Sequence, residues 1–356
     1  MRRMSRIAVA SVASLLASGP VAAEPPAAPT VTVGGSLETY YQYSLARPRA
    51  GLVGLRLEPT HGAFTLASAT VDATVTADRA HARVALAAGA TPAAIYAAEA
   101  DPGAWQVVRE ANAGAALGAE VTVDAGLFLS PIGPESVASK DDWNWSRSTP
   151  FLALPAYHVG VRATRPLGHG VTAQAWLVNG WNAAVDTNRG KTVLVGGAWA
   201  GDGASAQVLY AGGVERPTGA AEGAPWRHLV DAYAIVAVAD AADVMVHVDG
   251  GVEDGRDGGH QWLAGAVYGR WRLGPQVELA ARIDGVHEWT DAGVTPLLLG
   301  VEQVVAGTLT ALWRAAPQLL VRGELRHDRA SADVLPGRDG ARGDQTTATA
   351  AMTAWF

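Results

Sequence analysis

The charged residues with the clearest potential for chemistry lie in one long predicted loop, residues 130–155. Its ionisable side chains stand beside two tryptophans, and they are Glu135, Lys140, Asp141, Asp142 and Arg147. Loops of this length within a compact fold usually carry function or are mobile. Carboxylates and a guanidinium placed around one aqueous passage can sort ions and polar solutes by charge. We therefore expect the loop to fold into a lumen and narrow it; the alternative is a solvated outer loop whose tryptophans pack at a rim.

A second set of charged residues alternates with apolar ones along the late part of the chain. Successive side chains of a strand point to opposite faces of its sheet, so such alternation predicts one apolar and one polar face. On this pattern we expect the following residues to point inward: Arg270, Arg272, Glu278, Arg282, Asp284, Arg322, Glu324 and Arg326. Arginines facing acids across a pore would produce a transverse field that favours oriented dipolar solutes. Replacing Arg322 and Arg326 with Glu would then raise the preference for cations.

Motifs for catalysis, cofactors or metals are weak. His287-Glu288 begins like the helix of a zinc protease, but position 291 is Asp and the surrounding pattern is that of a strand. The nine histidines are dispersed, none with the spacing of a ligand set, and the chain has no cysteine. We expect no enzymatic activity, no cofactor and no metal.

The elements that must position these residues are long strands. Alternation and turn residues predict strands over 35–46, 62–76, 78–89, 106–117, 119–129, 156–167, 170–181, 191–201, 203–215, 228–239, 243–254, 260–273, 275–289, 297–315, 317–328 and 345–356. Globular strands usually have about 5–6 residues, whereas tilted membrane-spanning strands need about 9–11. Most of the predicted strands are long enough to span a membrane.

The predicted connections alternate between short and long. Single residues or brief turns separate some strands, and the long connections are 47–61, 90–105, 130–155, 182–190, 216–227, 254–259, 290–296 and 329–344. Short turns on one rim and long loops on the other are the layout of an outer-membrane barrel. We predict an all-β fold, a transmembrane antiparallel β-barrel of about 16 strands, with 14 or 18 also open. Its last strand, 345–356, would pair with 35–46.

Composition and the N-terminus narrow the class of protein. Hydrophobic residues make up 49% of the 356-residue chain and charged residues 17%, which argues against disorder. The net charge of −7 makes nucleic acid an unsuitable partner. Arginines, a short apolar run and Val21-Ala22-Ala23 predict a signal peptide over 1–23. A periplasmic lead-in over 24–34 and a barrel over 35–356 would follow.

Aromatic residues near the predicted strand ends indicate a membrane. Amphipathic rings collect where hydrocarbon meets headgroups. The residues at such positions are Trp181, Trp199, Trp271, Trp289, Trp313, Trp355 and Phe356. The terminal Phe356 is also typical of the tag by which the barrel-assembly machinery binds outer-membrane barrels. Individual tryptophans of this set could instead be ordinary core or surface residues.

One stretch of about 65 residues carries a series of motifs that matches a known pattern. Gly126-Leu-Phe-Leu-Ser-Pro-Ile-Gly-Pro-Glu135 is followed by Trp145-Ser-Arg-Ser148 and by His158-Val-Gly-Val-Arg162. Together with the Asn-Gly-Trp-Asn that begins at Asn179, this pattern resembles the β-barrel porin-2 (OmpL-like) family. Val159 departs from the Thr that is common in that family, which we interpret as a change in wall chemistry. The resemblance implies an outer-membrane porin without naming its solute.

The sequence thus predicts passive diffusion of small hydrophilic solutes across the outer membrane. The expected partners are outer-membrane lipid, those solutes, the assembly machinery and a homo-oligomer. A secreted or periplasmic all-β protein that binds carbohydrate or mediates adhesion is the alternative. An outer-membrane hydrolase would need a catalytic constellation at the rim, for which Ser148 and His158 are the candidates.

Overall fold

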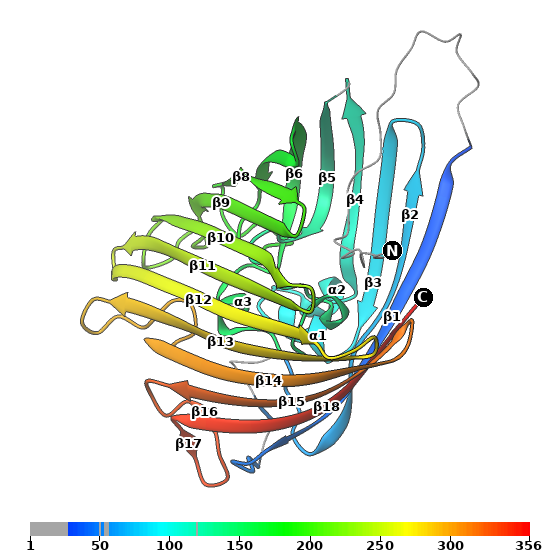
Figure 1. The fold of residues 1–356 in the computed structure, drawn as a ribbon. Helices are drawn as coiled ribbons and strands as arrows, with labels where there is room; N and C mark the ends of the chain where they lie inside the picture. The colour runs from blue at the N-terminus through cyan, green and yellow to red at the C-terminus, as the bar shows by residue number, and fades with distance from the viewer. Residues whose placement is uncertain (1–27, 50, 53–56, 119) are drawn as a thin grey trace, which may run out of the picture.

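Sixteen long strands close an antiparallel barrel (Figure 1). The computed structural model describes residues 28–49, 51–52, 57–118 and 120–356. The barrel strands are β1 (Thr30–Ser44), β2 (Ala63–Thr76), β3 (Ala80–Ala88), β4 (Val108–Leu117), β5 (Val121–Leu129), β6 (Tyr157–Gly168), β7 (Val171–Val178), β8 (Thr192–Gly201), β9 (Ala204–Val214), β10 (Trp226–Ala239), β11 (Ala242–Gly255), β12 (Gly258–Arg272), β13 (Val277–Thr290), β14 (Gln303–Ala316), β15 (Leu319–Ala330) and β18 (Asp344–Trp355). β18 pairs with both β15 and β1, so the sheet closes and has no open edge. Closure is required because lipid offers no hydrogen-bond partners to an unpaired strand.

Burial alternates along the strands as the sequence pattern predicts. In β14, Leu309 is 62% exposed on the outer face, whereas Thr308 and Thr310 on either side are buried in the interior. Similar exposed Val, Leu and Ile side chains are spread over the outer face. An apolar exterior around a more polar interior is the arrangement that a membrane barrel requires.

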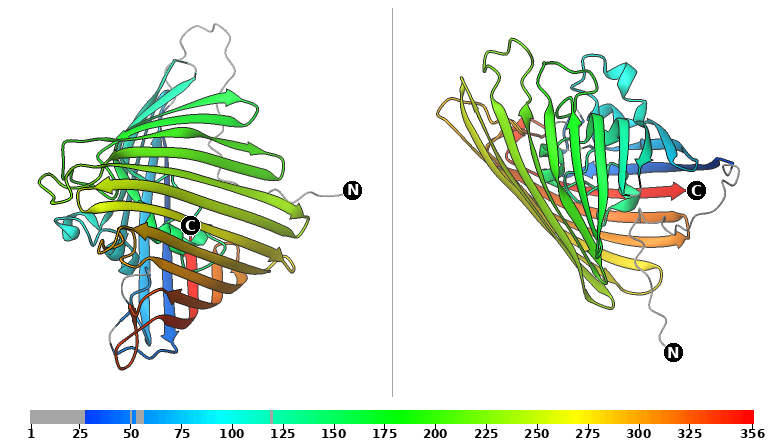
Figure 2. Two further views of the ribbon diagram at one scale, coloured as in Figure 1. Left: turned by 90° about the vertical axis from the view of Figure 1, so that its left-hand side faces the viewer. Right: turned by 90° about the horizontal axis from the view of Figure 1, so that it is seen from above.

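Short turns join the strands at one rim, and most of the long loops lie at the other (Figure 2). The long loops hold the short helices α1 (Ala90–Ile95), α2 (Pro102–Trp105) and α3 (Thr149–Ala153) and the 3₁₀ turn η1 (Ser139–Asp141). β16 (Leu335–Pro336) and β17 (Ala341–Arg342) form a two-stranded ribbon in the last loop. Among the described residues, no α-helix has the length and apolarity that a membrane crossing requires.

The predicted fold is confirmed, and the strand count is 16. Most strand boundaries shift by one to three residues, and three differences are larger or change a connection. β1 begins at Thr30, inside the predicted lead-in, because its first residues pair with the end of β2. The predicted long connection 254–259 is a two-residue turn, since Gly255 pairs with Gly258. The predicted signal peptide lies outside the described residues.

The third difference concerns β14, which was expected from 297 and begins at Gln303. The backbone N–H groups of Leu297 and Leu298 donate to the carboxylate of Glu288 on β13, at 2.6 and 2.9 Å. This inward-facing carboxylate holds Leu297 and Leu298 in a loop, and backbone bonding to β13 resumes only at Glu302, whose carbonyl accepts from the N–H of Glu288 at 2.7 Å.

The aromatic residues divide into two groups. Trp199, Trp271, Trp289 and Trp313 lie on the outer face and are about half exposed, so their role at the membrane interface stays a prediction supported by placement. The prediction is wrong for two others. Trp181 follows β7 in a loop and packs against an interior apolar cluster, and Trp355 contacts another interior cluster. Trp226, which the sequence analysis left out, is exposed on the outer face.

Candidate functional site: a loop inside the barrel

The connection between β5 and β6 runs into the barrel. We call residues 130–156 the inserted loop. Residues 142–150 are all buried, and α3 lies within the space that the strands enclose (Figure 1). Charged and polar side chains from β1, β13, β14 and β15 bind its backbone or its side chains, across separations of more than 100 residues. Long-range contacts, rather than local sequence, therefore fix its position.

The first anchor of the inserted loop is a pair of arginines on β13 and β15, the two strands that flank β14. Arg282 donates to the carbonyl of Ser146 at 2.6 Å and to that of Arg147 at 3.1 Å. Arg326 also donates to the carbonyl of Arg147. On β13, Asp284 completes the anchor by accepting from the backbone N–H of Thr149 at 2.7 Å. Two guanidinium groups and a carboxylate thus hold one turn of loop backbone.

The second anchor lies on β1 and β15. Glu324 accepts from the backbone N–H groups of Trp145 and Ser146, at 2.7 and 3.1 Å. Arg322 donates to the carbonyls of Ser139 and Asp142, at 2.8 and 3.1 Å. On β1, Glu38 accepts from the hydroxyl of Ser139 at 2.9 Å. The anchoring side chains share an inward position, burial and a loop partner, and we call them the clamped wall: Glu38, Arg282, Asp284, Arg322, Glu324 and Arg326.

Inside the loop, the predicted charged residues hold one another. Arg147 donates to the carbonyl of Ser136 at 3.1 Å and lies 3.5 Å from the carboxylate of Asp142. Glu135 accepts from the backbone N–H of Ser148 at 2.9 Å. Burial raises the pKa of the Asp142 carboxyl well above its usual range, although Arg147 acts in the opposite direction. Glu135 and Arg147 therefore stabilise the fold of the loop, whereas burial disfavours the ionised form of Asp142.

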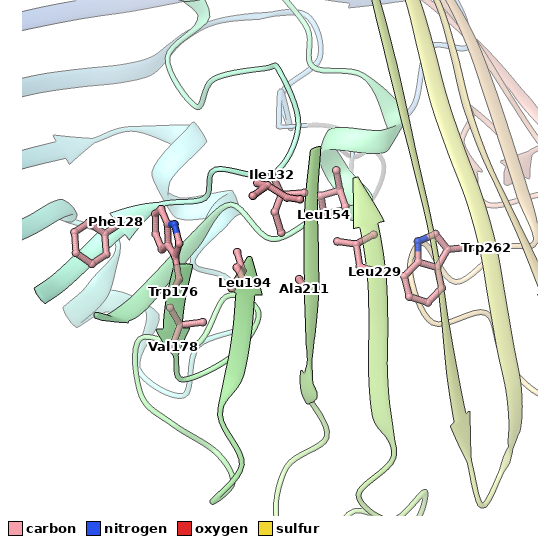
Figure 3. Close-up of a cluster of buried hydrophobic side chains, with 10 residues drawn as sticks. Phe128, Ile132, Leu154, Trp176, Val178, Leu194, Ala211, Leu229 and Trp262 are labelled. Carbon is pink, nitrogen blue, oxygen red and sulfur yellow. The ribbon is translucent and has the colours of Figure 1, made fainter. Parts of the chain in front are cut away.

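An apolar cluster packs the two ends of the loop against the barrel interior (Figure 3). Ile132 and Leu154 come from the loop and contact inward-facing residues of the strands. The wall residues of this cluster are Phe128, Trp176, Val178, Leu194, Leu209, Ala211, Leu229 and Trp262. The interior is therefore polar in some sectors and apolar in others, which the alternation alone did not predict.

A different arrangement lies on β2 to β6, toward the rim of short turns. Arg83 donates to Asp72 at 3.1 Å and to Glu110 at 3.0 Å, which links three neighbouring strands. Arg162 donates to Asp124 at 2.9 Å, and that carboxylate also lies 2.5 Å from His81.

These side chains are inward-facing and several remain accessible: Arg83 is 36% exposed, His81 32% and Arg162 31%. No hydrogen bond connects them to the inserted loop among the described residues. We call Asp72, His81, Arg83, Glu110 and Arg162 the accessible wall.

Three of the remaining predicted charges lie at the rim of short turns. Arg270 and Arg272 both bind Asp243, the former at 2.6 Å, and Glu278 lies 4.0 Å from Arg270. In the loop, Lys140 pairs with its half-exposed neighbour Asp141 at 2.7 Å. The structure thus places the predicted residues in three groups rather than around one constriction.

The sequence analysis missed the whole accessible wall and Glu38. The period of two that located the late strands also runs through β2 to β6, and it could have found Arg83 and Arg162. Glu38 carries no local signal, because its partner Ser139 is 101 residues away.

Ser148 and His158, the candidate residues for a hydrolase, do not hydrogen-bond to each other. Ser148 caps α3, where its hydroxyl accepts from the backbone N–H of Phe151 and donates to Glu135. His158 lies 3.1 Å from the hydroxyl of Ser130, and its Nδ1 faces the carbonyl of Gly180 rather than a carboxylate.

Comparison with known proteins gives a family and a fold. The family described as "Putative beta-barrel porin-2, OmpL-like" matches residues 30–356. No curated protein matches the chain. Among solved structures, OmpT of Vibrio cholerae with loop L8 deleted is 12% identical, with a TM-score of 0.62 over 92% of this chain and 99% of that one. The anion-selective porin from Comamonas acidovorans is 13% identical, with a TM-score of 0.61 over 92% of this chain and 100% of that one.

Proposed function

Because the chain belongs to the β-barrel porin-2, OmpL-like family and is an outer-membrane porin, we propose where its solutes pass. Small hydrophilic solutes diffuse along the accessible wall, past a constriction that the inserted loop forms from the opposite side. The observation that supports this route is a difference in exposure: the side chains of Arg282 and Arg326 are 0 and 2% exposed, against 36 and 31% for Arg83 and Arg162. Of these four arginines, only Arg83 and Arg162 are accessible to water and to a passing solute.

The accessible wall carries charges of both signs in alternation. Asp72, Arg83 and Glu110 follow one another across three strands, each within about 3 Å of the next charged group. Such a row can replace part of the hydration shell of an ion or a dipolar solute as it passes. Its partly solvated arginines are the cations through which we expect the wall to set ion preference.

The test is the reversal potential of the refolded protein in planar bilayers under a salt gradient. Arg83→Glu and Arg162→Glu should each move the permeability ratio toward cations. Arg165→Glu is the matched control, because Arg165 lies on the same strand as Arg162 but pairs with Glu120 at an exposed position. If both wall variants change the ratio no more than this control does, the solute does not follow the accessible wall.

We propose further that the channel catalyses no reaction. This rests on the geometry of the two serine–histidine arrangements, since Ser148 and His158 have separate partners and the imidazole that faces Ser130 has no carboxylate behind it. Hydrolysis of p-nitrophenyl esters by the refolded protein, lost on Ser130→Ala, would contradict the proposal.

A homotrimer is the assembly that we propose. A hollow of about 600 Å³ on β1, β2, β3 and the end of β18 is lined mostly by small and apolar residues, among them Leu37, Val71 and Leu86. Another solved form of Vibrio cholerae OmpT, 11% identical, is described as a trimer form. Light scattering of the detergent-solubilised protein should give three chains per particle, and Ala88→Arg in this hollow should give monomers.

Phe356 is proposed as the contact for the assembly machinery. Its side chain is 77% exposed, while its backbone pairs with Gly35 and so ends the β18 ladder. Deleting Phe356 should reduce the amount of heat-modifiable barrel in cells while leaving refolding in detergent unchanged.

A further inference from the structure

Two carboxylates oppose each other inside the barrel, and no arginine or lysine among the described residues pairs with either of them. Asp231 on β10 and Asp249 on β11 are a directly paired position of the antiparallel ladder, and both side chains point inward. Like charges directly opposite across two strands destabilise a sheet. Their side chains are 0% exposed, so water does not screen the repulsion.

The only ionic partner of this pair among the described residues is a histidine. His247 Nε2 lies 2.6 Å from Asp231 Oδ2 and 3.9 Å from Asp249 Oδ2. The indole of Trp262 acts on the Asp249 carboxylate, but no hydrogen bond of good geometry reaches either of its oxygens or Nδ1 of His247 within the described part of the chain. One imidazole cannot neutralise two buried carboxylates, and unpartnered buried oxygens of this kind are costly.

Two other buried acids on the inner wall are bound by arginines. On the same strand as Asp249, Glu253 is bound by Arg216 at 2.6 Å and Arg227 at 2.8 Å. On β13, Asp284 is bound by Arg282 at 2.7 Å. Asp249 has no such arginine, so its charge must be neutralised either by a proton or by a cation from outside the chain.

We propose that Asp231, His247 and Asp249 bind a divalent transition-metal ion of the zinc type. One ligand atom from each residue lies within 4.8 Å of the other two, and Nε2 of His247 and Oδ2 of Asp231, which are 2.6 Å apart, would separate slightly to share one ion. An imidazole nitrogen with two carboxylate oxygens suits zinc, whereas calcium and magnesium prefer oxygen ligands alone. Three protein ligands leave a fourth position for water.

The site would also connect the ion to the inserted loop. The backbone N–H of Gly133 donates to Asp231 Oδ1 at 3.1 Å, so this ligand is oriented by the first residues of the loop. Partners of this kind fix the direction of metal-binding carboxylates. The ion would thus stabilise the point at which the loop leaves the wall.

The test uses the full-length mature protein without a histidine tag, refolded in detergent and stripped with EDTA. Isothermal titration with Zn²⁺ should give one ion per chain, and Co²⁺ should give the visible bands of a four-coordinate site. Asp249→Asn and His247→Gln should each weaken zinc binding about tenfold or more. His158→Gln, which removes a buried histidine that has no carboxylate partner, should bind as the wild type does. Absence of binding, or equal loss in the control, would overturn the proposal.

Thermal unfolding gives an independent readout that does not need a measured affinity. Without metal, Asp249→Asn should unfold at the same or a higher temperature than the wild type, because it removes the repulsion with Asp231. Zinc should raise the unfolding temperature of the wild type only. A metal-free Asp249→Asn protein that is less stable than the metal-free wild type would contradict the inference, since the carboxylate would then have a favourable partner other than an ion.

Discussion

Arginine–carboxylate pairs lie on both the clamped wall and the accessible wall, but their arginines differ in exposure and in what else they bind. On the clamped wall, Arg282 is 0% exposed and donates to two carbonyls of the inserted loop. On the accessible wall, Arg83 is 36% exposed, and its partners are side chains of the two neighbouring strands. The residue types and the inward positions are the same. The presence of loop backbone therefore decides whether an inward arginine is a structural anchor or a charge that faces the solute.

This difference changes the expectation for Arg322 and Arg326. Both were predicted to act on passing ions, yet both are buried against carbonyls of the inserted loop. Replacing them with Glu would place a carboxylate against carbonyl oxygens and so weaken loop docking. The Glu variants of Arg322 and Arg326 therefore test the docking of the inserted loop rather than the ion preference of the channel.

The largest effect should come from Arg282→Met. It removes the donor to Ser146 and Arg147 and leaves Glu135 and Asp284 without their guanidinium. Breaking a buried ion pair from one side costs about 3–5 kcal/mol. We expect the free energy of unfolding, measured by urea titration in lipid vesicles, to fall by that amount, and single-channel conductance to rise as the loop loosens.

Arg272→Met is the control for this prediction. Arg272 also binds a carboxylate on a neighbouring strand, but it is 28% exposed at the rim and has no hydrogen bond to the loop among the described residues. It should change neither the conductance nor the unfolding free energy by more than about 1 kcal/mol. Equal effects of the two variants would remove the distinction between anchored and accessible arginines.

A smaller, pH-dependent effect should come from Asp142. Its pKa is raised by burial, so the folded loop binds the proton more tightly than the unfolded chain does. This stabilisation is fully present below the pKa of an unfolded aspartate, about 3.9, and is lost as pH rises through the raised pKa. We expect the loop to resist limited proteolysis better at acid pH than at pH 7. Asp142→Asn should reduce that difference, and a variant with an unaltered pH profile would assign it to other acids.

The barrel could be predicted from the sequence because a strand has a period of two and a membrane requires long strands. All sixteen predicted strands overlap those of the structure, and the charged residues of β13 and β15 face inward as expected. The predicted position of Trp181 at the membrane interface is wrong because Gly180, with a φ of +155°, turns the chain out of the ladder. The indole of Trp181 then packs inside the barrel.

The binding partner of each inward-facing charged side chain could not be predicted from the sequence in the same way. Whether Arg282 meets water or loop backbone depends on the path of residues 130–156, and that path is fixed by contacts such as Glu38 with Ser139. The pairing of Asp231 with Asp249 depends on the register of two strands, which a spacing of 18 residues in the sequence does not reveal. Local patterns give the face of a strand, and only the tertiary structure gives the partner.

The smallest effect should come from Arg83→Ala, which tests the comparison from the accessible side. Arg83 binds two acids, as Arg282 does, but its partners keep contact with solvent: Asp72 is 25% exposed and Glu110 16%. Exposed ion pairs contribute about 0–1 kcal/mol because water replaces the lost partner. The free energy of unfolding should therefore fall by no more than that, while the reversal potential moves toward cation preference. A loss as large as that of Arg282→Met would mean that Arg83 is as desolvated as the anchors, and the two walls would then differ only in what they bind.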